Sequence, residues 1–129
     1  MFKNIFFIIF SLLSLSCSKN AEFQFNGSDI SQANLNPSFE LLSHTGEIRK
    51  NTDFRGSVVA IFFGFTHCPD ICPTTMQELK YIRESLGKQG DELQVLFITL
   101  DPERDEQSLL SSYVPSFDKS FIGLTGSQE

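Results

Sequence analysis

An apolar run at Val58–Phe65 (VVAIFFGF) is the clearest feature in the pattern of hydrophobic and polar positions along the chain. A short apolar run that does not alternate with polar residues is typical of a strand buried on both faces. We therefore predict a central strand there. Leu93–Leu100 predicts a second apolar strand, and Phe121–Leu124 predicts the start of a third.

Between the first two strands, Thr74–Leu86 predicts an amphipathic helix. Apolar residues recur there at intervals of three and four positions, which places them on one helical face. Thr75 and Glu78 fit a capping box at its start. Gly87 follows the last apolar position and is a good C-terminal stop.

A second helix is expected to run from Asp101 to about Tyr113, with Asp101 as its cap and Pro102 in its first turn. The resulting order of strand, helix, strand, helix and strand indicates an α/β fold with parallel strands. The loops at the carboxyl ends of parallel strands meet at one edge of the sheet. Asp101 and the loop after Phe65 are therefore expected to lie at the same edge.

Upstream of these elements, Ser38–Leu42 and Ile48–Lys50 have weaker strand character, with a turn at His44–Glu47 between them. We expect His44 to be a solvated residue of that turn. Residues 17–36 are polar and predict a tether, so that residues 37–129 form the folded domain.

Residues 1–16 have the pattern of a secretory signal, in which Lys3 precedes an apolar stretch and small residues lead to Cys17. The end of this segment is similar to a bacterial lipoprotein signal, which predicts a lipidated Cys17 and a membrane anchor. Ordinary cleavage and an uncleaved anchor are the alternatives. In each case we expect export to the periplasm or the outer face of the cytoplasmic membrane. A thiol pair oxidises there unless it is protected or re-reduced.

Composition sets two further limits. The chain has 129 residues, which leaves room for one domain. Its formal net charge is −6, which argues against nucleic acid as a partner, because phosphates are bound by basic surfaces. The acidity otherwise indicates a solvated surface.

Cys68 and Cys72 are the strongest candidates for chemistry. They lie in the predicted turn between a strand and a helix N-terminus, where the helix dipole and unpaired backbone N–H groups favour thiolates. Two thiolates at such a place can exchange disulfides or bind a soft metal such as Cu(I). A structural disulfide is the third alternative, and the two cysteines alone leave all three open.

Three segments together carry a family resemblance: Phe63–Thr74 (FGFTHCPDICPT), Phe97–Asp105 (FITLDPERD) and Phe121–Gly126 (FIGLTG). They resemble the Sco/SenC family of copper-handling proteins, from about residue 36 to the end. The resemblance implies a thioredoxin-like fold on the outer face of an energy-transducing membrane, with copper bound through the two motif cysteines. It also implies a role in assembling the copper site of cytochrome c oxidase, with an upstream copper donor or thiol reductant as a second partner.

One part of the family pattern is missing from this sequence. The family's copper site includes a distal histidine, a third ligand that extends its use from Cu(I) to Cu(II). The sequence ends at Glu129 before that segment, and its two histidines, His44 and His67, lie elsewhere. We therefore expect a thioredoxin-like fold that is incomplete at its C-terminus, as in a fragment or truncated product.

His67 and Asp101 are candidates for a supporting role around the thiols. His67 precedes Cys68 and could stabilise its thiolate or touch the metal, and its alternative role is to shape the turn. Asp101 could tune thiol protonation or hydrogen-bond a ligand, and its alternative role is to cap the second helix.

The function that the resemblance implies is that of a copper chaperone rather than an enzyme. Cu(I) would pass from the thiolates of Cys68 and Cys72 to those of the target by ligand exchange. The first alternative is an exported thiol-disulfide oxidoreductase, in which one thiolate attacks a partner disulfide and the other resolves the mixed disulfide. The second is an inactive truncated remnant with exposed apolar surface.

Overall fold

The computed structural model describes residues 26–33 and 38–127. The predicted signal segment and Cys17 lie outside the described residues. The chain divides into two units, residues 1–35 and 36–129. In the first unit, residues 26–33 are exposed and form turns, in which the backbone N–H of Ser31 donates to Asp29 and that of Ala33 donates to the carbonyl of Ile30. The tether over residues 17–36 remains a prediction.

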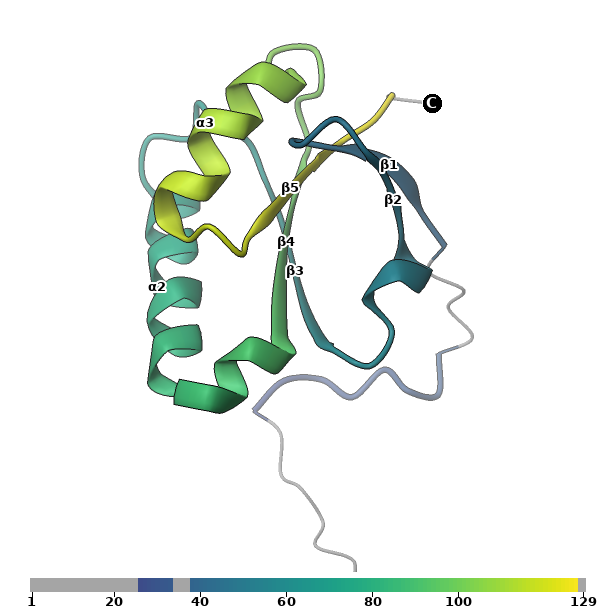
Figure 1. Cartoon of the computed structure of the whole chain (residues 1–129), viewed down its shortest axis with the longest axis vertical. Helices are drawn as coiled ribbons and strands as arrows, with labels where there is room; N and C mark the ends of the chain where they lie inside the picture. The colour runs from purple at the N-terminus through teal and green to yellow at the C-terminus, as the bar shows by residue number, and fades with distance from the viewer. Residues whose placement is uncertain (1–25, 34–37, 128–129) are drawn as a thin grey trace, which may run out of the picture. The chain divides into compact units, whose positions relative to one another are not determined.

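In the second unit, the described residues form a five-stranded mixed sheet in the order β2-β1-β5-β4-β3 (Figure 1). The strands are β1 (Glu40–Ser43), β2 (Ile48–Lys50), β3 (Val58–Gly64), β4 (Leu93–Thr99) and β5 (Ile122–Thr125). β4 pairs in parallel with β3 and β5, whereas β1 is antiparallel to β2 and β5. The predicted α/β fold with parallel strands is confirmed.

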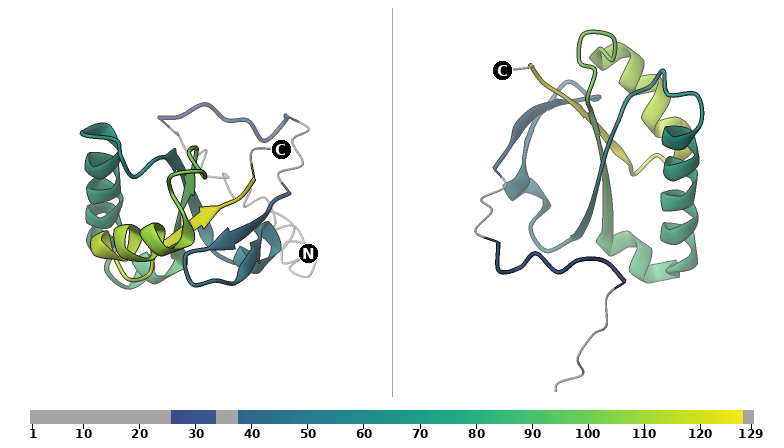
Figure 2. Two further views of the ribbon diagram at one scale, coloured as in Figure 1. Left: turned by 90° about the horizontal axis from the view of Figure 1, so that it is seen from above. Right: turned by 180° about the vertical axis from the view of Figure 1, so that it is seen from behind.

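The helices α2 (Ile71–Ser85) and α3 (Gln107–Phe117) cover one face of this sheet (Figures 1 and 2). Because side chains alternate along a strand, β4 contributes to both faces. The buried core under the helices consists of Met76, Val95, Phe97, Leu110, Val114 and Phe121. A smaller cluster on the opposite face contains Phe54, Leu96 and Leu124, with Phe54 supplied by the short 3-10 helix η1 (Asn51–Phe54).

β3 differs from the predicted central strand. Among the described residues β4 is its sole partner, so β3 forms an edge of the sheet. Phe62 packs against the core under the helices, but Ile61 and Phe63 on the other face are 45% and 56% exposed. The prediction was wrong because an apolar sequence shows only that a strand is suited to burial on both faces. Whether both faces are buried depends on the elements that pack against the strand.

α2 begins three residues earlier than predicted. Asp70 is the residue before its first turn and makes no side-chain capping bond, so the capping box predicted at Thr75 is not present. The earlier start is compatible with Pro73, because the N–H groups of a first helical turn have no partner within the helix. Gly87, with a φ of 56°, follows the end of α2, and a second 3-10 helix, η2 (Gly87–Glu92), leads to β4. The predicted stop is thus confirmed.

α3 begins six residues later than predicted, with Glu106 as the residue before its first turn. The carbonyl of Asp101 instead accepts the backbone N–H groups of Arg104 and Asp105 in a separate turn. The Asp101 side chain accepts a hydrogen bond from Arg104 Nε at 2.5 Å. Capping of α3 by Asp101 was therefore a wrong prediction, since this segment closes a turn of its own before the helix starts.

His44 is half-buried rather than a solvated turn residue. Its backbone N–H donates to the carbonyl of Gly123 at 2.8 Å, and its ring Nδ1 accepts the N–H of Gly123 at 3.0 Å. Burial lowers the pKa of His44. The turn after β1 is thus fixed to β5, a contact between distant segments that the local polar sequence does not indicate.

Candidate functional site

The two cysteines lie where β3 gives way to α2. Cys68 is a partly exposed residue of the connecting loop, and Cys72 is a buried residue, 6% exposed, in the first turn of the helix. Both are free thiols. The backbone N–H of Cys72 donates to Cys68 Sγ over 3.4 Å. The N-terminus of α2 therefore points at the sulfur of Cys68.

The surroundings shift the pKa values of the two thiols in opposite directions. The backbone N–H of Cys72 is the main cause that lowers the pKa of Cys68, followed by the Cys72 side chain and the backbone of Asp70. Burial is the main cause that raises the pKa of Cys72. The predicted thiolate-favouring turn is thus confirmed for Cys68 and wrong for Cys72, because the Cys72 side chain is buried although the residue lies in the first turn of α2.

Cys72 is buried at the end of β3, against the backbone of Gly64. A Cβ atom added at Gly64 would lie 3.1 Å from Cys72 Sγ, 2.9 Å from the Phe62 ring and 3.0 Å from the Phe97 ring. The sulfur thus lies close to Gly64 and to both aromatic rings, in a residue that is 6% exposed. Such apolar packing explains the raised pKa, because burial disfavours a charged thiolate.

Asp105 is the charged residue that contacts the cysteine loop. Its side chain is fully buried, and its carboxylate accepts hydrogen bonds from the backbone N–H of Thr66 at 2.9 Å, from the Thr66 hydroxyl at 2.5 Å and from the Thr99 hydroxyl at 2.7 Å. Thr66 precedes Cys68 by two residues, and Thr99 ends β4. The carboxylate therefore links the loop to the end of the neighbouring strand.

The structure places the two predicted supporting residues differently. His67 is exposed, and its Nδ1 lies 3.1 Å from the Thr66 hydroxyl and 3.8 Å from Asp105 Oδ1. Asp101 lies in the loop after β4, where its side chain pairs with Arg104. His67 thus lies close to Asp105 and to Thr66, which donates to Asp105. No hydrogen bond within the described ranges joins the Asp101 side chain to the cysteine loop.

Tyr113 adds a second buried polar group near the thiols. Its ring packs against Phe97 and Phe117, and its hydroxyl is buried with no hydrogen-bond partner among the residues that the structure describes. Burial raises the pKa of Tyr113, and the charges of Cys72, Cys68 and Asp105 raise it further. Phe97, which the Tyr113 ring contacts, also lies beside Cys72.

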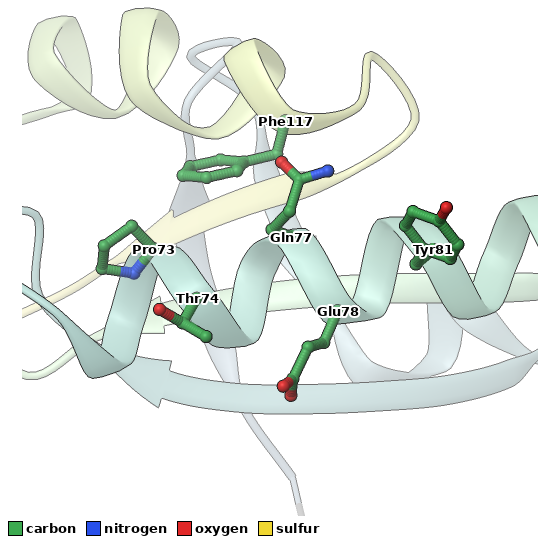
Figure 3. A pocket seen from close by; sticks show the side chains of 6 residues that line it. All are labelled: Pro73, Thr74, Gln77, Glu78, Tyr81 and Phe117. Carbon is green, nitrogen blue, oxygen red and sulfur yellow. The ribbon is translucent and has the colours of Figure 1, made fainter.

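A shallow hollow on the surface begins next to the cysteines. Figure 3 shows α2 side chains along its floor and Phe117 of α3 above them. Pro73, which follows Cys72 directly, is at one end and Tyr81 is at the other. The cysteines themselves do not line this hollow. Its lining residues are Pro73, Thr74, Gln77, Glu78, Tyr81 and Phe117.

The donor groups at the site are two thiols. Within residues 26–33 and 38–127, no three His, Cys, Asp or Glu side chains are grouped so that they could hold a metal ion together. Two thiolates are soft ligands that suit Cu(I), which accepts two-coordinate binding. The same two thiols can also form a disulfide.

None of the helices in the described residues is long and apolar enough to cross a membrane.

Neither Asp105 nor Tyr113 is predicted as a site residue from the sequence. The rule that placed Asp101 at the cysteine edge of the sheet applies equally to the rest of the loop after β4, and it could have included Asp105. Asp105 instead falls within the first turns of the helix that the sequence predicts from Asp101 to about Tyr113. The position of Tyr113 depends on how α3 packs against β4, for which the sequence carries no local signal.

Comparison with known proteins gives the family. Residues 27–129 match the family model described as SCO1/SenC. The chain is 48% identical over 93 residues to "Protein SCO2 homolog, mitochondrial" of Danio rerio, which covers 70% of this chain and 33% of that protein. The structure is similar to that of Bradyrhizobium japonicum ScoI with copper bound, with 38% identity, a TM-score of 0.66, and coverage of 70% of this chain and 57% of that one.

Yeast Sco1 with copper bound is a second similar structure, with 40% identity, a TM-score of 0.65, and coverage of 70% of this chain and 50% of that one. The chain spans about a third of the length of the curated vertebrate relatives that it matches. The predicted thioredoxin-like fold is confirmed by these structural matches. Since the family model matches most of the chain, the protein belongs to the SCO1/SenC family.

Proposed function

We propose that this chain binds Cu(I) through Cys68 and Cys72 and delivers it for assembly of the copper site of cytochrome c oxidase. The observation that carries the proposal is the pair of free thiols at the end of β3, with the N–H of Cys72 directed at Cys68 Sγ. Two relatives of known structure, at 38% and 40% identity, hold copper. Soft thiolates are the ligands that Cu(I) prefers.

The unequal thiols suggest how metal would enter and leave. Cys68 is partly exposed with a lowered pKa, so its thiolate meets the incoming Cu(I) first. Cys72 then loses its proton as the metal binds, because a coordinating thiol must be deprotonated. A thiolate of the target approaches from the side of Cys68 and takes a third position on the metal. Stepwise ligand exchange then moves Cu(I) to the target, with no covalent bond between the proteins.

We also propose that the protein is exported and acts at the outer face of the membrane, held there through Cys17. The support for this lies in residues 1–17, where an apolar stretch ends in small residues and a cysteine. A tether would hold the copper site near a membrane-bound oxidase. Labelling of the expressed chain with a radioactive fatty acid tests this, and loss of the label in Cys17→Ser is the expected result.

A Cu(I) titration against a competing chelator tests the proposed function. The reduced full chain should bind one Cu(I), and Cys68→Ser or Cys72→Ser should each weaken binding by at least about a thousandfold, because one thiolate cannot hold the ion alone. Cys17→Ser is the matched control and should bind as the unmodified chain does. Binding that survives in either of the first two variants would contradict the assignment of both cysteines as ligands.

A thiol-disulfide oxidoreductase is the second candidate, and the opposite pKa shifts favour it. An exposed thiolate suited to attack and a buried thiol suited to resolve are what disulfide exchange needs. In that case Cys72→Ser should trap a mixed disulfide between Cys68 and a partner protein, visible on a non-reducing gel. Equal loss of copper in both single variants without such trapping favours metal delivery.

A further inference from the structure

Asp105 is a buried carboxylate beneath the loop that carries Cys68. It has no exposed surface, and among the described residues the one basic side chain within 4.0 Å of its oxygens is that of His67, at 3.8 Å. A buried carboxylate is costly unless hydrogen bonds satisfy it. Asp105 meets this need through the backbone and hydroxyl of Thr66 and the hydroxyl of Thr99.

These hydrogen bonds continue the contact between two strands beyond the point where the sheet ends. The β3–β4 ladder ends with Gly64 opposite Thr99. Asp105 then joins Thr66, two residues after Gly64, to Thr99 through its side chain. The next residues on the cysteine side are His67 and Cys68. The carboxylate therefore fixes the Phe65–Thr66 peptide, two residues before the first thiol.

We propose that Asp105 is a positioning residue for the Cys68 and Cys72 thiols. It holds Thr66, two residues before Cys68, against the end of β4, so that Cys68 Sγ stays in front of the α2 N-terminus. Both a two-coordinate Cu(I) complex and a disulfide require the two sulfurs to converge, and a fixed loop lowers the cost of bringing them together. The Cu(I) part of the argument rests on the proposed function, whereas the disulfide part does not.

The test compares Asp105→Ala with Asp101→Ala in the reduced full chain. Asp101 lies in the same loop and carries the same charge, but its side chain pairs with Arg104 rather than with the cysteine loop. Cu(I) affinity is measured against a competing chelator. The dithiol–disulfide equilibrium is measured in glutathione buffers by thiol labelling. In that reaction the two cysteine thiols lose two protons and two electrons to form one S–S bond, and oxidised glutathione gains them and gives two molecules of glutathione.

We expect Asp105→Ala to weaken Cu(I) binding about tenfold and to shift the equilibrium about tenfold toward the dithiol, a midpoint potential about 30 mV less negative. Asp101→Ala should leave both quantities within about twofold of the unmodified chain, because the Asp101 side chain pairs with Arg104 and makes no hydrogen bond to the cysteine loop within the described residues. The sign of the copper effect separates positioning from charge. A copper bis-thiolate is an anion, so removal of a negative charge alone would strengthen binding. Unchanged or tighter binding by a folded Asp105→Ala variant would therefore overturn the proposal.

If Asp105→Ala does not fold, Thr99→Val and Thr99→Ser test the positioning proposal in its place. Thr99→Val removes the hydroxyl that donates to Asp105 and keeps the branched shape of the side chain, whereas Thr99→Ser keeps the hydroxyl. We expect Thr99→Val to shift the midpoint potential in the same direction as Asp105→Ala and Thr99→Ser to restore it. A lower melting temperature for Thr99→Val with an unshifted potential would overturn the proposal. If the unmodified chain binds no Cu(I), the proposed function fails. The midpoint potentials of the variants then still decide whether Asp105 positions the two thiols.

Discussion

Cys68 and Cys72 belong to one short motif, yet the protein gives them different environments. Cys68 lies in the loop and receives backbone N–H groups of the α2 N-terminus, whereas Cys72 lies in the first turn of α2 with its buried side chain against Gly64. The sequence predicted both cysteines as the chemical site and predicted low pKa values for both. The difference between them could not be predicted, because it depends on which of the two side chains faces the core.

At the residue scale, alkylation of the reduced metal-free chain should distinguish the two thiols by pH. The thiolate is the reactive form, and the pKa of Cys68 is lowered while that of Cys72 is raised. Cys68 should therefore react with iodoacetamide at lower pH than Cys72, and faster at every pH where Cys72 remains protonated. Mass mapping of pulse-labelled peptides across a pH series measures both. A common pH midpoint for the two thiols would contradict the described asymmetry.

At the scale of elements, the end of β3 and the first turn of α2 form one packed unit. The apolar run correctly predicted the strand, and the amphipathic pattern correctly predicted the helix. The early start of α2 at Ile71 could not be predicted from capping residues, because Asp70 makes no side-chain capping bond. The site is nevertheless built on this junction, since Gly64 leaves space for Cys72 Sγ.

Gly64→Ala tests the junction between β3 and α2. The added methyl group would lie about 3 Å from two aromatic rings and from Cys72 Sγ, closer than side chains normally pack. We expect the free energy of unfolding to fall by about 1–3 kcal/mol, as overpacked cores do, which a urea titration followed by circular dichroism measures. Gly27→Ala is the control, because an added Cβ there meets nothing within 4 Å. Equal stability of both variants and the unmodified chain would contradict close packing at Gly64.

At the scale of the whole molecule, the sheet is covered unequally. The helices α2 and α3 lie on one face, and β3 is an edge strand in the part of the chain that the structure describes (Figure 2). On the face of β3 away from the helices, three apolar side chains are exposed: Val59, Ile61 and Phe63. β3 contains neither a charged residue nor a proline. An edge strand of this kind pairs readily with another chain.

Ile61→Lys tests the consequence of this free edge. We expect the full chain to self-associate as its concentration rises, and the charged side chain to reduce this association because charges on edge strands prevent pairing. Light scattering coupled to size-exclusion chromatography measures the mass. Ile82→Lys, at a similarly exposed position on α2, is the matched control and should associate as the unmodified chain does. A concentration-independent monomer mass for the unmodified chain would contradict the prediction.

The sequence by itself determined the order of strands and helices, the cysteine pair as the chemical site and the family. Each of these depends on a local pattern of apolar spacing or on residues within a short motif. The tertiary structure alone decided that β3 lies at an edge, that His44 is tied to β5 and that Asp105 holds the cysteine loop. These features depend on contacts between segments far apart in the chain, and such contacts leave no periodicity in the sequence that could reveal them.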